Sequence, residues 1–333
     1  MQLDHRESYL FKKIVPFDAK EVNNIEDLLR ALKNCSFQGR NLGIALDILY
    51  KMVTDKECLT ILTLSGAMVP AGMGELINLL LENKLIDVLV TTGANITHDF
   101  VDYATNVGHY IGSPYVDDDE LYKFKINRIY DTFLPEENYE KAEEMLLRII
   151  DDSFPSKNIE MAPSDFFKII GENLENRCIL SIAAKHNIKV FVPALSDSEF
   201  ALDLIRYTVK NGYKIILDEF EDVKKFADII NKTNDCGTFI IGGGVPRNWA
   251  QQVFPYLDGL EKFREHGVKS GYKYSVRIHT ATEYDGGLSG CTISESKSWG
   301  KYSLDATSVS IWCDATIAFP ILVTGLLQRL KIQ

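Results

Sequence analysis

The residue with the clearest chemical potential is Lys301, which ends the segment Ser298-Trp299-Gly300-Lys301. An indole ring beside an amine can exclude water, and desolvation lowers the pKa of a lysine because it disfavours the charged form. A neutral lysine amine is a nucleophile toward carbon and forms imines. The segment therefore predicts a catalytic lysine, although a surface lysine beside a packed tryptophan would have the same local sequence.

Glycine-containing turns follow several apolar runs of the chain. The run Gly242-Gly243-Gly244 lacks Cβ atoms, so its backbone could approach a pyrophosphate, and the N–H groups of the next helix would face that anion. It is not the G-x-G-x-x-G fingerprint, so a simple tight turn explains it equally well. Ser65-Gly66 and Thr91-Thr92-Gly93 are also compatible with ordinary turn chemistry.

The elements that must position these turns alternate between apolar strands and amphipathic helices. Apolar strands separated by helices predict an α/β, Rossmann-like fold, with a mainly parallel central sheet and helices on both faces. Ligands in such sheets bind beyond the carboxyl ends of the strands, where the glycine turns fall. The predicted strands are 58–64, 86–90, 189–192, 213–217, 238–241, 274–279 and 308–313; the helices between and after them are 75–82, 199–211, 218–231 and 315–330.

Further helices are predicted outside this alternation by the spacing of apolar residues. They cover 24–32, 41–53, 136–151 and 163–173, the last with Ser164 as its N-cap, and Pro246 is expected at the first position of the helix after the glycine turn. Residues 103–133 lack clear periodicity. Residues 1–20 are interpreted as an N-terminal arm and 21–333 as one catalytic domain.

Composition limits the class of protein. The 333 residues are 46% hydrophobic and 25% charged, typical of a globular chain. A net charge of -11 argues against a nucleic-acid partner, because phosphates would be repelled, and suits a cationic substrate.

Cellular location is predicted from the cysteines and the apolar runs. The six cysteines are scattered without a C-x-x-C pair, which favours reduced residues in a cytoplasmic protein. The first residues are charged rather than apolar, so no signal peptide is expected. The apolar run 311–327 contains Asp314 and Pro320, so it is interpreted as core and no membrane association is expected.

The histidines and cysteines have no metal-ligand spacing, and we predict no metal. His279 lies on a predicted strand and is interpreted as a packed core residue, whereas His98 lies near a proposed site. No Ser-His-Asp or Cys-His nucleophile set is evident.

Several blocks of the chain resemble the deoxyhypusine synthase family, whose Ser-Trp-Gly-Lys motif carries the catalytic lysine. The blocks occur in the family's order and span the chain from about residue 59 to its end. They are Leu89-Val90-Thr91-Thr92-Gly93, Val192-Pro193-Ala194-Leu195-Ser196-Asp197, Ile241-Gly242-Gly243-Gly244-Val245, Thr280-Ala281-Thr282-Glu283-Tyr284-Asp285-Gly286, Ser298-Trp299-Gly300-Lys301 and Asp314-Ala315-Thr316.

The resemblance implies roles for particular residues. Lys301 would be the catalytic nucleophile, Glu295 would bind an amine end of the substrate, and Trp299 would pack along its methylenes. Further substrate contacts would come from Asp285, Trp249 and Asp203, the last displaced by one residue from the family spacing. NAD would contact Ser65, Gly66, Thr91, Thr92, Gly93, Asp197, Gly243, Gly244, Thr280, Ala281, Ser289, Asp314 and Ala315. Without the resemblance, Asp197 would more simply cap the following helix.

The sequence departs from the family at the substrate end. Asn248-Trp249 stands where members that form deoxyhypusine have paired histidines, and Leu288 stands where they have an aspartate. Thr97-His98-Asp99 also replaces acidic residues. These changes remove a carboxylate and a possible proton relay.

The resemblance implies an NAD-dependent transferase that moves an aminobutyl group of a polyamine through an imine on Lys301. The acceptor would be a lysine of a translation factor of the five-A type, or else a free diamine such as putrescine, giving homospermidine. A third alternative is a cofactor-binding homologue without transferase activity. The family also implies a homotetramer built as a dimer of dimers.

Overall fold

A six-stranded parallel sheet forms the centre of the molecule. The computed structural model describes residues 9–10, 12–261 and 271–332, so the predicted arm and the predicted domain both extend in part outside the described residues. The strand order is β11-β10-β9-β1-β2-β7, and every pair in it is parallel. The predicted α/β fold is confirmed. The strands are β1 (Cys58–Leu64), β2 (Val88–Thr91), β7 (Lys189–Phe191), β9 (Asp235–Ile241), β10 (Tyr272–His279) and β11 (Tyr302–Trp312).

The sheet has a topological switch point between β1 and β9. From β1 the chain adds β2 and β7 on one side, then returns to place β9, β10 and β11 on the other side. Connections that leave in opposite directions open a crevice beyond the carboxyl ends of the two central strands. Ser65-Gly66 follows β1 and Gly242-Gly243-Gly244 follows β9, so this topology brings these two turns to the crevice.

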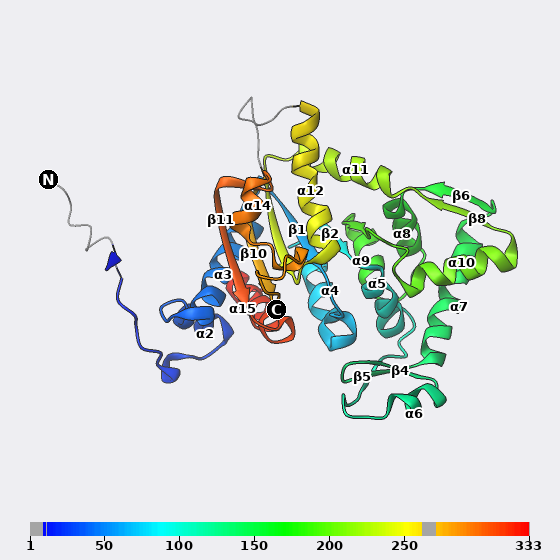
Figure 1. Ribbon diagram of the computed structural model, residues 1–333, viewed down its shortest axis with the longest axis horizontal. Coiled ribbons are helices and arrows are strands. Elements are labelled where there is room, and N and C mark those ends of the chain that lie inside the picture. Colours follow the sequence, from blue (N-terminus) through cyan, green and yellow to red (C-terminus); the bar gives the residue numbers. More distant parts are fainter. Residues whose placement is uncertain (1–8, 11, 262–270, 333) are drawn as a thin grey trace.

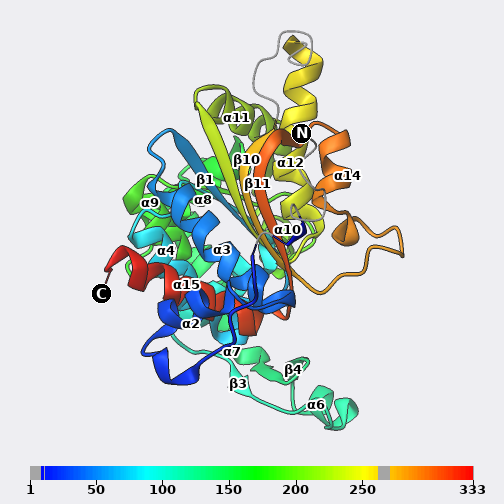
Figure 2. The same ribbon diagram turned by 90° about the vertical axis from the view of Figure 1, so that its left-hand side faces the viewer.

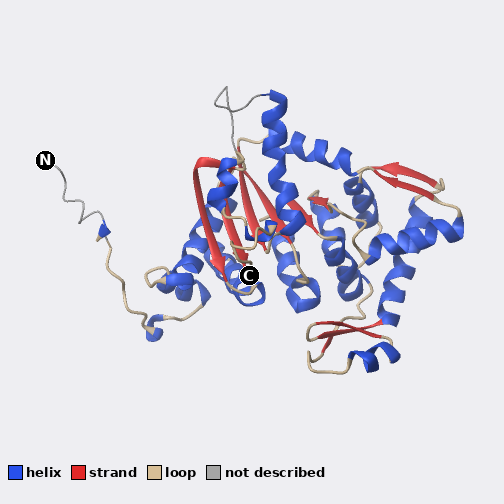
Figure 3. Cartoon of the chain, viewed as in Figure 1, coloured by secondary structure: helices blue, strands red, loops and turns tan. Residues whose placement is uncertain are grey.

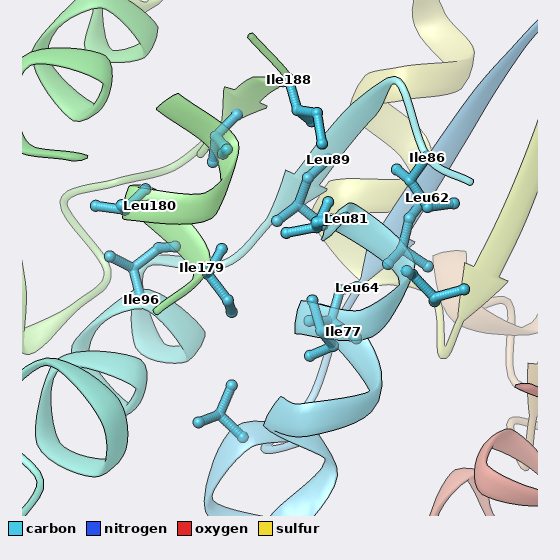
Figure 4. Packing of buried hydrophobic residues seen from close by; sticks show 14 of the residues in the cluster. Leu62, Leu64, Ile77, Leu81, Ile86, Leu89, Ile96, Ile179, Leu180 and Ile188 are labelled. Carbon is cyan, nitrogen blue, oxygen red and sulfur yellow. The ribbon is translucent and has the colours of Figure 1, made fainter. Parts of the chain in front are cut away.

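Helices cover both faces of the sheet (Figure 2). Successive strand residues point to opposite faces, so apolar side chains on each face pack against the helices on that side. Leu62 and Leu64 of β1 pack in the larger core with helices on one side, whereas Ile61 packs in a second core on the other side. The first layer contains α2 (Ile25–Leu32), α3 (Phe37–Thr54), α4 (Gly74–Glu82) and α15 (Ala315–Leu330); the second contains α11 (Glu219–Asn231) and α12 (Gly244–Glu261). Figure 4 shows Leu64 and Leu89 of the strands beside Ile77 and Leu81 of α4.

A group of helices extends the larger core past β7. Within this group, α5 packs on α10, α8 packs on α9, and α7 contacts α8 (Figure 1). Their bounds are α5 (Gly93–Asp99), α7 (Glu136–Ser153), α8 (Pro163–Glu172), α9 (Ile179–His186) and α10 (Glu199–Asn211).

The predicted strand 213–217 does not join the central sheet. It forms β8 (Lys214–Leu217), which pairs in parallel with β6 (Asn158–Met161) in a separate two-stranded sheet (Figure 3). Lys214 and Ile216 are exposed while Ile215 and Leu217 are half-buried, so one face meets water. A strand with one wet face cannot replace the central strands, which are covered on both faces.

The aperiodic segment 103–133 contributes to a small antiparallel sheet that projects from the helical group (Figure 3). It consists of β3 (Tyr110–Ile111), β4 (Ile126–Ile129) and β5 (Thr132–Pro135), with α6 (Asp118–Lys123) beside it. The remaining short elements are η1 (Ala19–Glu21), η2 (Val69–Met73), η3 (Phe100–Ala104), η4 (Leu288–Gly290) and α14 (Ile293–Ser298).

The predicted N-cap of α8, Ser164, is wrong, although the predicted first residue is confirmed. Ala162 is the N-cap, Pro163 is the first helical residue, and Ser164 lies inside the first turn. The N–H of Ser164 donates to the carboxylate of Asp222 at 3.1 Å, so an acid on α11 satisfies a free N–H group of this helix. The fixed φ of proline favours the first helical position, so Ala162 rather than Ser164 takes the N-cap position.

Several other predictions agree with the structure. The predicted bounds of β1, α10 and α15 match residue for residue. Pro246 lies in the first turn of α12, but as its third residue rather than at the predicted first position, because the helix begins at Gly244. Across residues 9–10, 12–261 and 271–332, no helix combines the length and the apolar character needed to span a bilayer.

Candidate active site

A cleft of about 390 Å³ lies beyond the carboxyl ends of β1, β9, β10 and β11. It forms at the reversal of strand order, where α/β sheets bind their ligands. Nine of the thirteen residues predicted to contact NAD line it: Ser65, Gly66, Gly243, Gly244, Thr280, Ala281, Ser289, Asp314 and Ala315. Met68, Cys313 and His279 complete parts of the wall, although His279 was predicted to be only a core residue.

The three glycines are required by the shape of this cleft. Gly242 has a φ of 81° and Gly244 a φ of 59°, and residues other than glycine rarely adopt these backbone angles. A Cβ on Gly243 would lie 3.0 Å from the Cα of Ser289, closer than normal packing allows. At Gly244, by contrast, a Cβ would meet nothing within 4 Å. The open space beside Gly244 leaves room for a ligand to approach the backbone, which fits a dinucleotide.

Hydrogen bonds close the glycine turn against its neighbours. The Ser65 hydroxyl donates to the carbonyl of Gly243, and the N–H of Gly244 donates to Ser289 Oγ at 3.0 Å. Pro246 has no N–H group. The start of α12 therefore offers fewer free N–H groups than the sequence suggested, and the serine hydroxyls occupy part of that site.

Two buried arginines that the sequence analysis did not single out hold this region together. Arg277 of β10 donates from Nε to the carbonyl of Gly242 at 3.1 Å, from Nη1 to that of Cys291 at 2.9 Å, and from Nη2 to that of Ser289. Arg247 of α12 donates from Nη2 to the same Cys291 carbonyl at 2.8 Å. Burial, with a contribution from Arg247, lowers the pKa of Arg277 to about 10. The signal was present in the sequence as a charged residue inside the apolar run Val276-Arg277-Ile278.

The Ser-Trp-Gly-Lys segment is a helix-terminating turn. Helix α14 ends at Ser298, and Gly300 follows with a φ of 72°. Gly300 N–H donates to the carbonyl of Lys297 at 3.0 Å, and Lys301 N–H donates to that of Ser296 at 3.2 Å. This pair of bonds is the Schellman motif, which needs a left-handed residue at the glycine position. The motif fixes the direction in which Lys301 leaves the helix.

The amine of Lys301 is buried and held by an amide. Only 6% of the residue is exposed, and Nζ donates to Asn248 Oδ1 at 2.9 Å. Burial lowers the pKa of Lys301, and the nearby charge of Arg247 lowers it further. Lys301 does not line the 390 Å³ cleft; Asn248 instead connects it to α12, whose first residue, Gly244, does line it.

Trp299 does not provide the shield that the sequence suggested. Trp299 is 60% exposed. Among the described residues, no contact between a cation and an aromatic ring involves Lys301. The Schellman turn points consecutive residues in different directions, so Trp299 faces outward while Lys301 faces α12. Glu295 is also exposed, and its charge acts on Lys301 in the direction that raises the lysine pKa.

Two other predicted substrate residues have structural partners of their own. Asp285 accepts from the Thr282 hydroxyl at 3.1 Å and from Gly287 N–H at 2.7 Å, so it orders its loop. Trp249 packs against Phe226 and Phe191, with ring centroids 5.1 and 5.2 Å away. Neither side chain lines the cleft at the glycine turn.

The remaining predicted cofactor residues lie at the ends of β2 and β7, outside the lining of this cleft. Thr92 is the N-cap of α5 and accepts from Asn95 N–H at 3.3 Å, and Gly93 begins that helix. Thr91 donates to the carbonyl of Leu64 at 3.4 Å. Asp197 is exposed, and the alternative that it caps the next helix is wrong because Ser198 does so.

Asp203 lies on α10, outside the lining of the cleft. It is 6% exposed and forms an ion pair with Arg206. Burial, with a contribution from Glu143, raises its pKa to about 7. The extra residue between Asp197 and Asp203 is consistent with this placement, because one residue turns a helix by about 100°.

Replacing Gly300 with alanine is expected to destabilise the protein by about 1 to 2 kcal/mol, because the left-handed backbone costs that amount for a residue with a Cβ. The free energy of unfolding in urea measures the effect. Gly259→Ala is the matched control, since Gly259 lies within α12 with nothing within 4 Å of the added Cβ. There alanine is expected to stabilise the helix. Equal effects at both positions would contradict the turn assignment.

A second titratable group, Asp102-His109-His98, lies at the helical end of the molecule. Asp102 accepts from His109 Nδ1 at 2.5 Å, and the other nitrogen of His109 lies 2.9 Å from His98 Nδ1. Because Asp102 takes the first hydrogen bond, a neutral His109 accepts from His98. Burial, followed by the charge of His109, lowers the pKa of His98 to about 4.

This depressed pKa predicts a loss of stability in acid. A histidine with a normal pKa when unfolded and a lower one when folded binds more protons in the unfolded state. The stability it supports is thus lost as the pH falls from about 6.5 to 4. From pH 7 to pH 5 the wild type is expected to lose about 2 kcal/mol more than His98→Gln. Urea unfolding at both pH values measures this, with His186→Gln as the control. Parallel losses in the wild type and His98→Gln would contradict it.

Comparisons with known proteins agree with this architecture. The family model for deoxyhypusine synthase matches residues 27–326. A protein of Archaeoglobus fulgidus named probable deoxyhypusine synthase 1 is 38% identical over 92% of this chain and 94% of its own length. One of Methanosarcina mazei named probable deoxyhypusine synthase 2 is 33% identical over 98% and 93%. A solved Entamoeba histolytica structure assigned as a deoxyhypusine synthase superposes with a TM-score of 0.63 at 20% identity, covering 95% of this chain and 97% of that one.

The parallel sheet and the cleft at its switch point define a Rossmann-like α/β protein. Within that class, the match over most of the chain shows that this protein belongs to the deoxyhypusine synthase family. Membership implies a transferase and is consistent with transfer of an aminobutyl group.

Proposed function

We propose that the protein is an NAD-dependent aminobutyl transferase that uses Lys301 as its nucleophile. The observation that carries the proposal is the buried amine of Lys301, whose pKa is lowered by burial and which donates to Asn248. A lysine with a lowered pKa retains more of the neutral form that attacks carbon. The deoxyhypusine synthase family membership supplies the reaction class.

The cleft supports NAD as the cofactor. The open space at Gly244, the hydroxyls of Ser65 and Ser289, and the Asp314 side chain at the start of α15 would hold the dinucleotide. When bound, NAD supplies a hydride acceptor and returns the hydride later. The other steps of the proposed reaction depend on side chains of the protein itself.

The neutral Nζ of Lys301 would attack the oxidised carbon beside the secondary nitrogen of spermidine. A bond forms between Nζ and that carbon, the bond from the carbon to the original nitrogen breaks, and 1,3-diaminopropane leaves with the proton that Nζ loses. The amine of the acceptor then attacks the same carbon and releases Lys301 as a free amine. Reduction of the new imine gives a stable secondary amine.

The acceptor is proposed to be a protein lysine, on a translation factor of the five-A type, or a free diamine. Two positions favour the diamine. Asn248, beside Lys301, cannot act as a base, and Leu288 is 46% exposed where a carboxylate would bind a cation. A relative of Chlorobaculum tepidum, 32% identical over 90% of this chain, is named only a deoxyhypusine synthase-like protein. Assaying both acceptors with the same labelled donor distinguishes deoxyhypusine from homospermidine.

We further propose that the protein is cytoplasmic, that residues 21–333 form one catalytic domain, and that it assembles as a homotetramer. Exposed apolar side chains support association between copies. Trp299, Tyr284 and Leu304 are 60%, 92% and 87% exposed, respectively. Exposed apolar groups of this kind mark contact surfaces when they are contiguous.

Trapping the lysine intermediate tests the proposed function. The full protein is incubated with NAD and spermidine labelled in its butyl segment, then reduced with borohydride. Label on the peptide that contains Lys301 is expected. Label on this peptide with labelled putrescine, but none with spermidine, would show that the donor is putrescine rather than spermidine. No label with either amine, in protein that binds NAD, would favour a cofactor-binding protein without transferase activity.

A further inference from the structure

Asn248 stands in direct contact with the amine on which the proposed reaction depends. Its Oδ1 accepts from Lys301 Nζ at 2.9 Å. Lys301 follows the Schellman turn, and Asn248 lies four residues after the glycine turn, on α12. The contact therefore joins two elements far apart in the sequence.

The neighbouring residue fastens the start of α12 to the lysine segment. Arg247 is 2% exposed and donates to the carbonyl of Cys291 at 2.8 Å and to Ser296 Oγ at 3.3 Å. Ser296 lies in α14, and its carbonyl also accepts from the N–H of Lys301. Because Arg247 precedes Asn248 and Ser296 also bonds to the backbone of Lys301, these contacts tie the position of Asn248 to the segment that carries Lys301.

The chemistry of an amide suits this place. An amide oxygen accepts from a lysine amine in either protonation state, carries no charge and does not take up a proton near neutral pH. A carboxylate in the same place would stabilise the ammonium and raise the lysine pKa. Among the titratable groups that act on Lys301, Cys291 and the exposed Glu295 favour the ammonium, whereas Arg247 disfavours it. The contact with Asn248 adds no negative charge to this balance.

We propose that Asn248 is a positioning residue for Lys301: it fixes the direction of Nζ while leaving the amine able to lose its proton. The inference rests on the proposed function, since it assigns Asn248 a part in the same reaction. It also implies that the proton released by Lys301 passes to the departing amine or to solvent, because the amide cannot hold it.

The charge of the side chain at position 248 provides the test. Asn248→Asp is expected to raise the pKa of Lys301 by about one unit or more, as an adjacent opposite charge does. This pKa is read by NMR of the Cε of labelled lysine, with the Lys301 signal identified by its loss in Lys301→Ala. Asn173→Asp adds the same charge at the exposed C-cap of α8 and is expected to leave that pKa unchanged.

Imine formation provides a second readout. In Asn248→Asp the rate of borohydride trapping is expected to fall at neutral pH and to recover at a pH higher by the same shift. In Asn248→Ala trapping is expected to be at least ten times slower at every pH, with thermal unfolding and NAD affinity close to wild type. An unchanged lysine pKa in Asn248→Asp, or an unchanged trapping rate in Asn248→Ala, would overturn the role of Asn248. An absence of trapping in the wild type would overturn the proposed function itself.

Discussion

Lys301→Ala is expected to lower kcat for aminobutyl transfer by roughly 10³-fold or more, the scale of loss seen when a catalytic nucleophile is removed. The variant loses the atom that forms the bond to the donor, whereas the cleft beside Gly244 is unchanged. NAD affinity is therefore expected to stay within a few-fold of wild type. Steady-state kinetics and NAD titration on the same preparation measure both quantities.

Two further variants show whether Lys301 acts as an amine or only as a cation. Lys301→Arg keeps a positive charge that cannot be lost near neutral pH, so it is expected to be as inactive as Lys301→Ala. Lys297→Ala removes a half-buried lysine of α14 that donates to the carbonyl of Leu304, and is expected to keep near wild-type activity. Activity retained in Lys301→Arg would exclude the nucleophile role and leave an electrostatic one.

Arg277→Met is expected to destabilise the protein by about 3 kcal/mol or more, because breaking buried polar networks has costs of this size. The substitution leaves the carbonyls of Gly242 and Ser289 without the guanidinium as a donor. Since these residues shape the glycine turn, NAD affinity is expected to fall at least tenfold. Urea unfolding and NAD titration measure the two effects.

An arginine on the surface provides the comparison. Arg128 forms an ion pair with Asp118 at 2.6 Å, and the aspartate side chain is 62% exposed. Exposed pairs contribute little, so Arg128→Met is expected to change stability by less than about 1 kcal/mol and to leave NAD binding unchanged. Similar losses in both variants would show that Arg277 does not hold the cleft in the way inferred from its three carbonyl contacts.

Local patterns in the sequence determined most of the elements. The continuous apolar run of β1 and the helical spacing of α10 and α15 fixed their bounds, because these segments bury the residues that their own periodicity selects. The pattern failed for β8, whose half-exposed residues pair outside the central sheet. It also missed α14, which is six residues long and ends in the turn that positions Lys301.

The sequence predicted the cofactor part of the candidate site better than the substrate part. Turns at the ends of β1, β9, β10 and β11 were predicted to meet, and nine of the residues predicted for NAD line one cleft. A parallel sheet places the carboxyl ends of neighbouring strands together, so their sequence positions imply proximity. Asp203, Trp249 and Asp285 were assigned through resemblance alone, and each has a partner elsewhere than in the cleft: Arg206 for Asp203, Phe226 for Trp249 and the N–H of Gly287 for Asp285.

The sequence by itself determined that this chain forms a parallel α/β sheet and that Lys301 follows a glycine suited to a left-handed turn. Periodicity and backbone stereochemistry are local properties, so they can be read along the chain. Only the tertiary structure decided that Lys301 is covered by α12 through Asn248 rather than by Trp299, and that Arg247 and Arg277 hold the glycine turn. Burial and hydrogen bonding between distant residues depend on how the elements pack, and that packing sets which amine can lose its proton.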